Sequence, residues 1–449
     1  SQQMGLHVFA LFLADATLRP GGRIAAVLPA PTFYSKYSDG LKTFLLSKYN
    51  IQYIIGTSTD KSFSEGSDLK EILLIADKRQ KNRNHDEITF ITLNEELTPN
   101  NYFSIANCVK KVDKGQFDIK FRKVSYSELK QNWNWIRYLE HGLLHNIAEK
   151  LKANSLIQSG SKLNLRIVRG FEMYGPEFFF LPNKNWKINV KDNQIVAKHD
   201  NGMTCIFSED ILIPALRKPG LYTKSITPEV GHYALRVKKE QIQKVPLKYV
   251  EERKKNWAVA EKRFGKDWLT HIHQQLESKK PFGHLFTVDK FGITTTGTII
   301  HYFEEEMTAS KNFYLIDCDR DVAKILAAWM SSTIFILLFL ASRREIGGAF
   351  GRLQIVDYLE EPIFIDSTKI PQIIQRKILN AFDHLRSHEL PSLRDQIGWP
   401  PRRKLDLAIL EVFNFKETTS TDFLEKIYDE VTRVFRESDN RGKKRRGRL

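Results

Sequence analysis

Two short stretches of the 449-residue chain place arginines beside glycines, a combination suited to contact with a polyanion. In "SRREIGGAFGRLQI", a glycine-containing turn is flanked by Arg343, Arg344 and Arg352. A flexible turn with guanidinium groups around it suits the backbone or a groove of DNA. In "RIVRGFEMYG", Gly170 permits close backbone approach, and Arg169 could reach a phosphate or a guanine edge. The alternative for both stretches is the charged, solvated end of an ordinary hairpin.

Other residue types that could do chemistry form no convincing site. The cysteines are few, widely spaced and without a CxxC pair, which argues against a zinc knuckle or a disulfide framework and fits a reducing cytoplasm; they are Cys108, Cys205 and Cys318. His271 and His273 lack a nearby cysteine or a spaced acidic partner, so we interpret them as surface histidines on a helix. The run Glu304 to Glu306 is interpreted as a solvated acidic patch rather than a nuclease site.

The composition favours a nucleic-acid partner. The net charge is +16 and the pI is about 9.5, with basic residues spread along the chain. Such a surface on a globular protein favours a polyanion, with nucleic acid first and an anionic membrane second. A basic protein without any polyanion partner remains the alternative.

One apolar run needs to be tested as a membrane span. Ile325 to Ala341 contains seventeen residues, includes Ser331 and Ser332, and is followed by charged residues. A span needs roughly 20 mostly apolar residues. We therefore predict a buried helix, or a helix that runs into a strand, and no membrane association. No basic-then-apolar leader opens the chain, so the expected location is cytoplasmic.

The elements that must position these residues begin with an α/β pattern. A helical stripe ends at Gly21, and the apolar run 23–28 is typical of a strand buried on both faces of a parallel sheet. A helix over 38–49 follows, and then strands over 51–58, 71–79 and 88–93. These make one end of a doubly wound sheet rather than a whole one, because six or seven strands would be needed.

The rest of the chain has a different pattern of apolar and polar residues. Residues 100–140 are expected to be irregular. Short strands and basic turns follow, as in a mixed α+β domain, and the pattern from about 371 onward is helical. The last nine residues hold six basic side chains and are expected to be disordered. The predicted regions are therefore 1–100, a connector over 101–140, 141–375 and 376–449.

The order of these pieces resembles the C-terminal half of gamma-type N6-adenine DNA methyltransferases, the TaqI-like and type IIG restriction-modification enzymes. "LRPGGRIAAVLPAPTFYSKYSDGLKTFLL" resembles the fifth strand of the methyltransferase sheet, and "IQYIIGTSTDKSFSEGSDLKEILLIADK" resembles its closing hairpin. "LRIVRGFEMYGPEFFFL" is similar to the start of a target-recognition domain, and the stretch from "ASKNFYLI" to "YLEEPIF" is similar to its end. "RRKLDLAILEVFNF" also resembles tails in the family.

This resemblance implies a fold and a set of site residues. The expected fold class is α/β: the C-terminal end of a Rossmann-like methyltransferase sheet, then an α+β target-recognition domain and a helical tail. Phe63 takes the position of the family aromatic that packs on the adenine flipped from the duplex; the alternative is a loop phenylalanine folded back onto the sheet. Arg169, Gly170 and Tyr174 match the turn that opens the recognition domain, and Lys311 and Asn312 resemble DNA-contact positions. A solvated turn is the alternative for the last pair.

The same resemblance implies S-adenosylmethionine as cofactor, yet the motifs that serve it are not found in this chain. In the family a glycine-bearing loop holds the cofactor and an Asn/Asp/Ser-Pro-Pro-aromatic motif holds the target amino group, and both precede the piece that opens this chain. The sole Pro-Pro, Pro400-Pro401, has Trp399 before it and Arg402 after it, which is the wrong context. We therefore expect a fragment or half of a split enzyme that is inactive alone and that holds no metal or catalytic residue.

The expected function is the DNA-recognition part of a restriction-modification or similar phage-defence methyltransferase. Its partners would be double-stranded DNA and the N-terminal half or a separate methyltransferase subunit. A second hypothesis is a non-enzymatic DNA-binding specificity module that works beside a separate methylating chain. A third is an RNA methyltransferase, although the size of the region after residue 141 favours duplex DNA.

Overall fold

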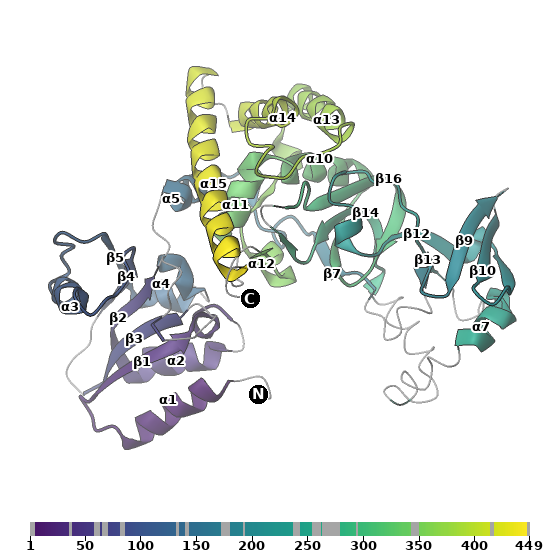
Figure 1. Cartoon of the computed structure of the whole chain (residues 1–449). Helices are drawn as coiled ribbons and strands as arrows, with labels where there is room; N and C mark the ends of the chain where they lie inside the picture. Colours follow the sequence, from purple (N-terminus) through teal and green to yellow (C-terminus); the bar gives the residue numbers. More distant parts are fainter. Residues whose placement is uncertain are drawn as a thin grey trace. The chain divides into compact units, whose positions relative to one another are not determined.

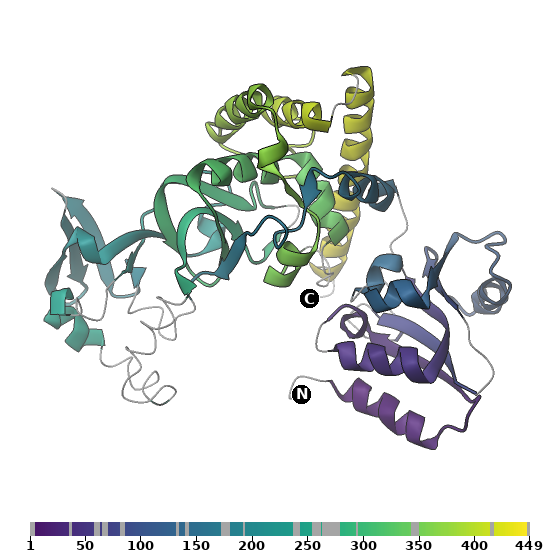
Figure 2. The same cartoon turned by 180° about the vertical axis from the view of Figure 1, so that it is seen from behind.

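The computed structural model forms two compact units, Ser1–Asn146 and Ile147–Leu449, which we describe separately (Figure 1; the opposite side in Figure 2). The structure describes residues 5–35, 38–57, 63–64, 71–80, 86–131, 134–139, 143–171, 180–191, 194–236, 243–253, 262, 279–292, 295–342, 350–413 and 417–446. The chain is a mixed α/β protein with several sheets.

The first unit is built on a five-stranded sheet with the order β1-β3-β2-β4-β5. Strand β3 runs antiparallel to both β1 and β2, β2 is parallel to β4, and β4 is antiparallel to β5. The strands are β1 (Arg23–Pro29), β2 (Tyr49–Thr57), β3 (Glu71–Lys78), β4 (Glu87–Leu93) and β5 (Ile119–Ser125). The helices are α1 (Leu6–Thr17), α2 (Asp39–Lys48), α3 (Tyr102–Lys111) and α4 (Tyr126–Gln131).

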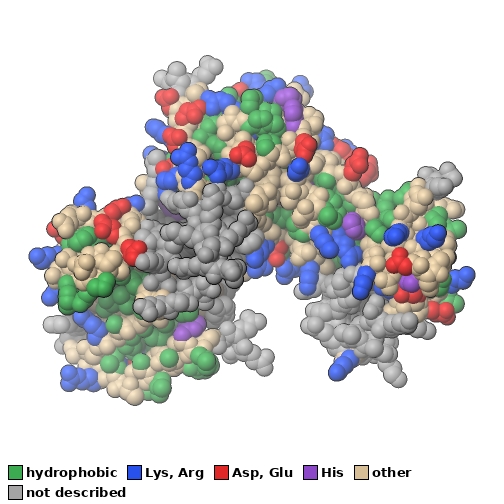
Figure 3. Space-filling view, in the orientation of Figure 1, with side chains coloured by type: hydrophobic (Ala, Val, Ile, Leu, Met, Phe, Trp, Pro, Cys, Tyr) green, Lys and Arg blue, Asp and Glu red, His purple; other side chains and the backbone are tan. Residues whose placement is uncertain are grey.

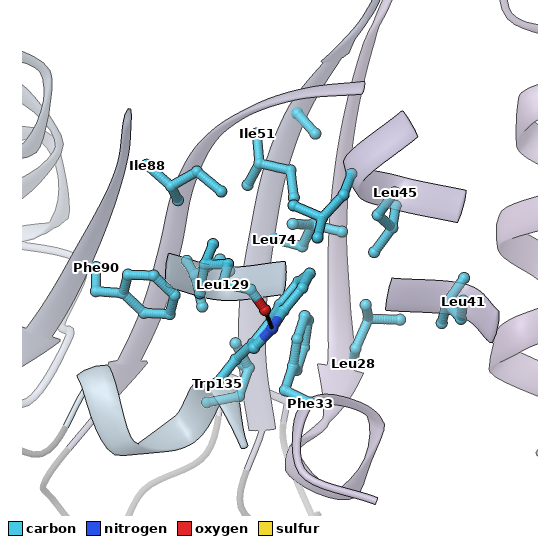
Figure 4. Close-up of a cluster of buried hydrophobic side chains, with 14 of the residues drawn as sticks. Leu28, Phe33, Leu41, Leu45, Ile51, Leu74, Ile88, Phe90, Leu129 and Trp135 are labelled. Atoms are coloured by element: carbon cyan, nitrogen blue, oxygen red, sulfur yellow. Dashed lines mark hydrogen bonds between the residues drawn. The ribbon is translucent and has the colours of Figure 1, made fainter. Parts of the chain in front are cut away.

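The two faces of this sheet are covered by different helices. Alternate residues of β3 point to opposite faces, so that Leu74 is fully buried in the main core while Leu73 packs in a smaller cluster. The main core receives apolar residues of α1, α2 and α4, and Figure 4 shows Leu41, Leu45 and Leu129 directed into it. The indole N–H of Trp135 donates to the carbonyl oxygen of Leu129 at 3.2 Å within this core. Helix α3 covers the other face through Ile105 and Val109.

Two expectations for this unit are wrong. Strand β1 is not buried on both faces: it pairs only with β3 among the described residues, and Val27 is 42% exposed. Residues 100–140 are not irregular, because they form α3, β5 and α4. Helix α3 escapes a search for long apolar runs because only one narrow stripe, which includes Ile105 and Val109, is buried.

The second unit contains a seven-stranded sheet with the order β7-β17-β14-β16-β12-β13-β8. Its strands are β7 (Arg166–Arg169), β8 (Phe180–Leu181), β12 (Leu212–Leu216), β13 (Tyr233–Leu235), β14 (Phe282–Val288), β16 (Ile300–Ala309) and β17 (Phe313–Asp317). A three-stranded antiparallel sheet of β9 (Trp186–Lys191), β10 (Gln194–His199) and β11 (Thr204–Phe207) shares a core with its β12-β13-β8 end and with α7 (Leu247–Arg253). Two small pairs are β15 (Phe291–Gly292) with β18 (Phe350–Gly351), and β6 (Ile157–Gln158) with β19 (Phe364–Ile365).

Helix α10 (Arg320–Met330) packs on the sheet at β14 and β16 (Figure 1). Four further helices pack on α10 and on one another: α11 (Thr333–Ser342), α13 (Gln372–Arg386), α14 (Pro400–Leu410) and α15 (Glu417–Arg446). The short α12 (Ile355–Glu360) lies next to β7. Helix α5 (Leu143–Lys152) contains the boundary between the units. Helix α15 continues to Arg446, so the disorder expected after residue 440 is wrong for 441–446.

The apolar run 325–341 lies in α10 and α11, which meet at an angle of 79° near Ser331 and Ser332. Most of α10 and all of α11 are buried, as predicted for a core helix. No single helix among the described residues is long and apolar enough to cross a membrane, although this bent pair passes such a test by length and composition.

Candidate nucleic-acid interface

Three segments of the second unit meet at Asp289, which follows β14 directly. The first contribution is Arg169, the last residue of β7. Its Nη2 group donates to the Asp289 carboxylate at 2.7 Å, and its Nε donates to the carbonyl oxygen of Lys311 at 2.8 Å. The guanidinium group also lies 5.8 Å from the ring centre of Tyr314. Arg169 therefore links the end of β7 to both β14 and the turn before β17.

The second contribution is Arg352, which follows β18. Its Nε and Nη2 groups donate to the two oxygens of Asp289 at 2.8 and 3.1 Å, a bidentate contact. Because β18 pairs with β15, residues 350–352 are held next to Asp289 by backbone pairing as well as by the Arg352 side chain. The hydroxyl of Tyr314 donates to the same carboxylate.

Backbone hydrogen bonds fix the third segment, the turn Ser310 to Asn312, between β16 and β17. The N–H of Asp289 donates to the carbonyl of Asn312 at 2.8 Å, and the N–H of Lys311 donates to the carbonyl of Phe171 at 2.9 Å. A Cβ at Gly170 would lie 2.4 Å from the carbonyl oxygens of both Ala309 and Ser310. The backbone thus approaches closely at Gly170 within the chain itself, and the role of Gly170 in DNA binding stays a prediction.

The resulting Asp289 cluster, defined as Arg169, Asp289, Tyr314 and Arg352, carries a net positive charge. Two guanidinium groups face one carboxylate. Burial, together with the hydrogen bond to Asp289, raises the pKa of Tyr314 to about 12, so the tyrosine hydroxyl stays a neutral donor. The side chains of Arg169 and Arg352 are 33% and 29% exposed, whereas that of Asp289 is 12% exposed. Neither arginine is a freely solvated side chain. The cluster can offer oriented guanidinium groups to an anion.

The exposed side chains of Lys311 and Asn312 lie in the turn beside this cluster. The predicted DNA-binding residues Arg169, Gly170, Lys311, Asn312 and Arg352 thus come together at one end of the β7-β17-β14 strands. The remaining three predicted residues, Tyr174, Arg343 and Arg344, lie outside the described residues, as do His271 and His273.

Phe63 belongs to the first unit and is half-buried. It packs against the cluster that includes Ile55, Ile91 and Ile105, beneath α3. This placement agrees with the alternative of a phenylalanine folded back onto the sheet, while stacking on a flipped base stays a prediction. Residues 58–62 and 65–70 around it lie outside the described residues.

The predicted acidic patch is exposed but paired. Glu304 accepts a hydrogen bond from the hydroxyl of Tyr302 and lies 3.2 Å from Arg386 and 3.6 Å from Lys324. Glu306 pairs with Arg236 at 2.6 Å. These carboxylates therefore hold β16 against its neighbours, and no group of three or more potential metal-ligating side chains occurs in the part of the chain that the structure describes.

Asp289 is the residue that sequence reasoning missed. The only signal is an acidic residue directly after the apolar strand run "HLFTV". Such a residue is usually solvated, and its role here follows from strand order, which brings in partners 120 and 63 positions away.

Among the described residues, the Pro-Pro pair does not fit the amino-group-binding motif that the resemblance implies for an S-adenosylmethionine enzyme. Pro400 and Pro401 open helix α14, where Pro401 is buried, and they present no amino-group-binding turn. The neighbouring Arg402 is also buried, and its Nε donates to Gln396 at 2.9 Å.

Figure 3 shows Lys and Arg side chains over both units, interspersed with acidic ones. This agrees with the distribution expected from the sequence. Most of the excess positive charge of the chain belongs to residues 147–449.

No protein-family model matches the chain, and no curated protein matches it. Among solved structures it is similar to the type IIG restriction endonuclease BpuSI, at 16% identity and a TM-score of 0.47 over 97% of this chain and 49% of that one. It is also similar to the type IIL restriction-modification enzyme MmeI in complex with DNA, at 14% identity and a TM-score of 0.45 over 91% of this chain and 50% of that one. A modification subunit of a type I restriction enzyme from Vibrio vulnificus YJ016 gives 19% identity and a TM-score of 0.22 over 30% of this chain and 33% of that one.

The chain thus spans about half the length of the first two structures. All of these TM-scores lie below 0.5.

Proposed function

We propose that the chain is the DNA-recognition part of a site-specific adenine-N6 DNA methyltransferase of a restriction-modification system, joined to the closing strands of that enzyme's catalytic sheet. The observation that carries the proposal is the Asp289 cluster. It brings Arg169 and Arg352, predicted as DNA contacts from two distant stretches, together beside the turn that carries the exposed Lys311. Arginine and lysine side chains of this kind position a protein on the phosphates of a duplex, while neighbouring turns read base edges.

The first unit supports the methyltransferase part of the proposal. The resemblance requires a closing hairpin next to the fifth strand of the sheet. Strand β3 lies between β1 and β2 and runs antiparallel to both, as such a hairpin would if β1 is the fifth strand. In this assignment the segment between β2 and β3 carries Phe63, which we propose to stack on the flipped adenine.

S-adenosylmethionine is the cofactor of the proposed enzyme and would be held by a polypeptide segment other than the one described. That segment would supply the glycine-bearing loop and the Pro-Pro-aromatic motif, either from the same protein or from a separate subunit. The residues of this chain contribute recognition and, through Phe63, the holding of the extruded base. We propose that the protein acts in the compartment that contains the cell's DNA.

A non-enzymatic specificity module would use the same DNA surface and is the second candidate. It is favoured by the absence of both cofactor motifs from the 449 residues. The two candidate functions differ in one requirement. Only the methyltransferase needs an aromatic side chain in the segment between β2 and β3.

Fluorescence anisotropy with labelled nucleic acids tests the proposal. We expect the chain to bind a random-sequence DNA duplex, with log K falling linearly as log salt rises. Duplex RNA and single strands of the same sequence should compete poorly. Failure to bind duplex DNA, or preference for RNA, would overturn the proposed function. A second assay adds the complementary methyltransferase segment and measures adenine methylation by the wild-type chain and by a Phe63 variant. Methylation that depends on Phe63 would favour the enzyme over the specificity module.

A further inference from the structure

The Asp289 cluster holds two arginines without using all of their donors. An arginine has five N–H groups in a planar fork. Arg169 uses Nε for Lys311 and Nη2 for Asp289, and its Nη1 group donates no hydrogen bond among the described residues. Arg352 uses Nε and Nη2 for Asp289. Both side chains remain about a third exposed to solvent.

The charge balance of the cluster also favours an anionic ligand. The carboxylate neutralises one of the two guanidinium groups, Tyr314 stays uncharged, and Lys311 adds a further positive charge at the neighbouring turn. Strands β7 and β14, whose ends carry Arg169 and Asp289, are separated in the sheet only by β17. The anion-binding groups therefore lie on rigid elements and not on a single mobile loop.

We infer that the Asp289 cluster is a binding site for a phosphodiester group of duplex DNA, and that Asp289 is its positioning residue, holding Arg169 and Arg352 in the orientation that receives the phosphate. The inference rests on the proposed function and adds to it a ligand class, a site and a residue that does not itself touch the ligand. Arginine is suited to this role because its rigid fork can bind a carboxylate with one edge and a phosphate with another.

This assignment predicts an effect with an unusual sign. Replacing Asp289 by Asn removes a negative charge from a DNA-binding surface, and electrostatics alone would then strengthen binding. If Asp289 positions the arginines, the same change weakens binding, because the Asn amide must direct an N–H group at one of the guanidinium groups and the bidentate contact is lost. The direction of the change in affinity thus separates a positioning role from a mere neighbouring charge.

The experiment measures affinity for a random-sequence duplex as a function of salt, using the full chain. Asp317→Asn is the matched control, because Asp317 lies at the other end of β17 and pairs with Arg166 at 2.6 Å outside the cluster. We expect Asp289→Asn to weaken binding about tenfold, the loss of roughly one charged hydrogen bond. It should also reduce the slope of log K against log salt by about 0.9, one phosphate contact. Asp317→Asn should leave both quantities unchanged or slightly strengthen binding.

A second variant keeps the test valid if Asp289→Asn folds poorly, which a thermal denaturation scan of each protein would show. Arg352→Lys preserves the total charge but cannot reproduce the bidentate contact. It should weaken binding by a similar factor, whereas Arg236→Lys, at an exposed arginine paired with Glu306, should not.

The outcomes distinguish the inference from the function on which it rests. Weaker binding by Asp289→Asn and Arg352→Lys, with both controls unchanged, supports the phosphate site. If the wild-type chain binds DNA and Asp289→Asn binds equally or more tightly, Asp289 is only a neighbouring charge and the inference fails while the proposed function stands. If the wild-type chain binds no DNA, the proposed function fails and the inference fails with it.

Discussion

The carboxylate of Asp406 accepts two hydrogen bonds from Thr333, one from the backbone N–H and one from the hydroxyl, each at 2.8 Å. Thr333 is the first residue of α11, so Asp406 of α14 closes the N-terminus of a helix that is distant in sequence. The hydroxyl of Tyr428, on α15, donates to the same carboxylate at 2.9 Å. The tail motif "RRKLD" therefore joins three helices of the second unit around a buried cap.

Asp406→Ala should destabilise the second unit by about 3 kcal/mol or more, because the cap is removed and the buried Arg402 loses its nearby anion. Urea denaturation followed by circular dichroism measures the change. Asp319→Ala is the control: Asp319 is the N-cap residue of α10 but makes no side-chain cap. Equal denaturation midpoints for the two variants would mean that the Asp406 cap adds nothing to stability.

His301 should make stability depend on pH. Burial lowers the pKa of His301 to about 4, and its Nδ1–H donates to the carbonyl of Ser225 at 3.1 Å. The unfolded chain binds a proton near pH 6.5 that the folded protein rejects, so stability is present above that pH and is lost as pH falls toward 4. Between about pH 6.5 and 5, the loss due to His301 is about 2 kcal/mol.

The measurement for His301 is the free energy of unfolding at both pH values for wild type and His301→Asn. The variant should lose that part of the pH dependence, whereas His384→Asn, at an exposed histidine of α13, should keep it. Parallel pH curves for wild type and His301→Asn would contradict the assignment.

Gly170→Ala should disturb the junction of β7 with the Ser310–Asn312 turn. The added Cβ would meet two carbonyl oxygens at 2.4 Å, and backbone atoms cannot move aside cheaply. We expect a loss of about 1–3 kcal/mol in unfolding free energy, together with weaker DNA binding. Gly231→Ala, where nothing lies within 4 Å of the new Cβ, should change neither. Wild-type behaviour of Gly170→Ala would show that the close approach is not required.

Local sequence patterns predicted much of the first unit and little of the candidate site. The strand predictions over 51–58, 71–79 and 88–93 agree with β2, β3 and β4 because continuous or alternating apolar runs are local signals. The sequence identified Arg169 and Arg352 as candidates because each is an arginine beside a glycine. Their contact with Asp289 could not be predicted, since it depends on the pairing of strands that are distant in sequence.

The errors have equally physical reasons. The apolar run of β1 indicated burial on both faces, yet burial depends on what covers the sheet, and Val27 is exposed in the described part of the chain. The basic residues after position 440 indicated disorder, but they continue the helix that the buried stripe of α15, including Leu424 and Val431, begins.

Substitutions of Phe63 in an assembled, methylation-competent enzyme can show whether its ring stacks on the target base or only packs against the sheet. If its ring stacks on the flipped adenine, Phe63→Leu, which keeps apolar bulk, should slow methylation roughly 5- to 150-fold, equivalent to about 1–3 kcal/mol of stacking. Phe63→Trp should retain most activity, and DNA binding should change little in either. A 2-aminopurine at the target position reports flipping by fluorescence. Normal methylation by Phe63→Leu would identify Phe63 as a packing residue.

If the Asp289 cluster and the Ser310–Asn312 turn form the DNA surface, two exposed lysines should differ in their effect on duplex binding. The comparison measures how the affinity for duplex DNA depends on salt. Lys311 lies in the turn bonded to Arg169, while Lys187 lies on β9 in another sheet with its side chain 86% exposed. We predict that Lys311→Ala weakens binding and lowers the slope of log K against log salt by about 0.9, whereas Lys187→Ala changes neither. Equal effects of the two variants, or a wild-type affinity that does not fall with salt, would contradict it.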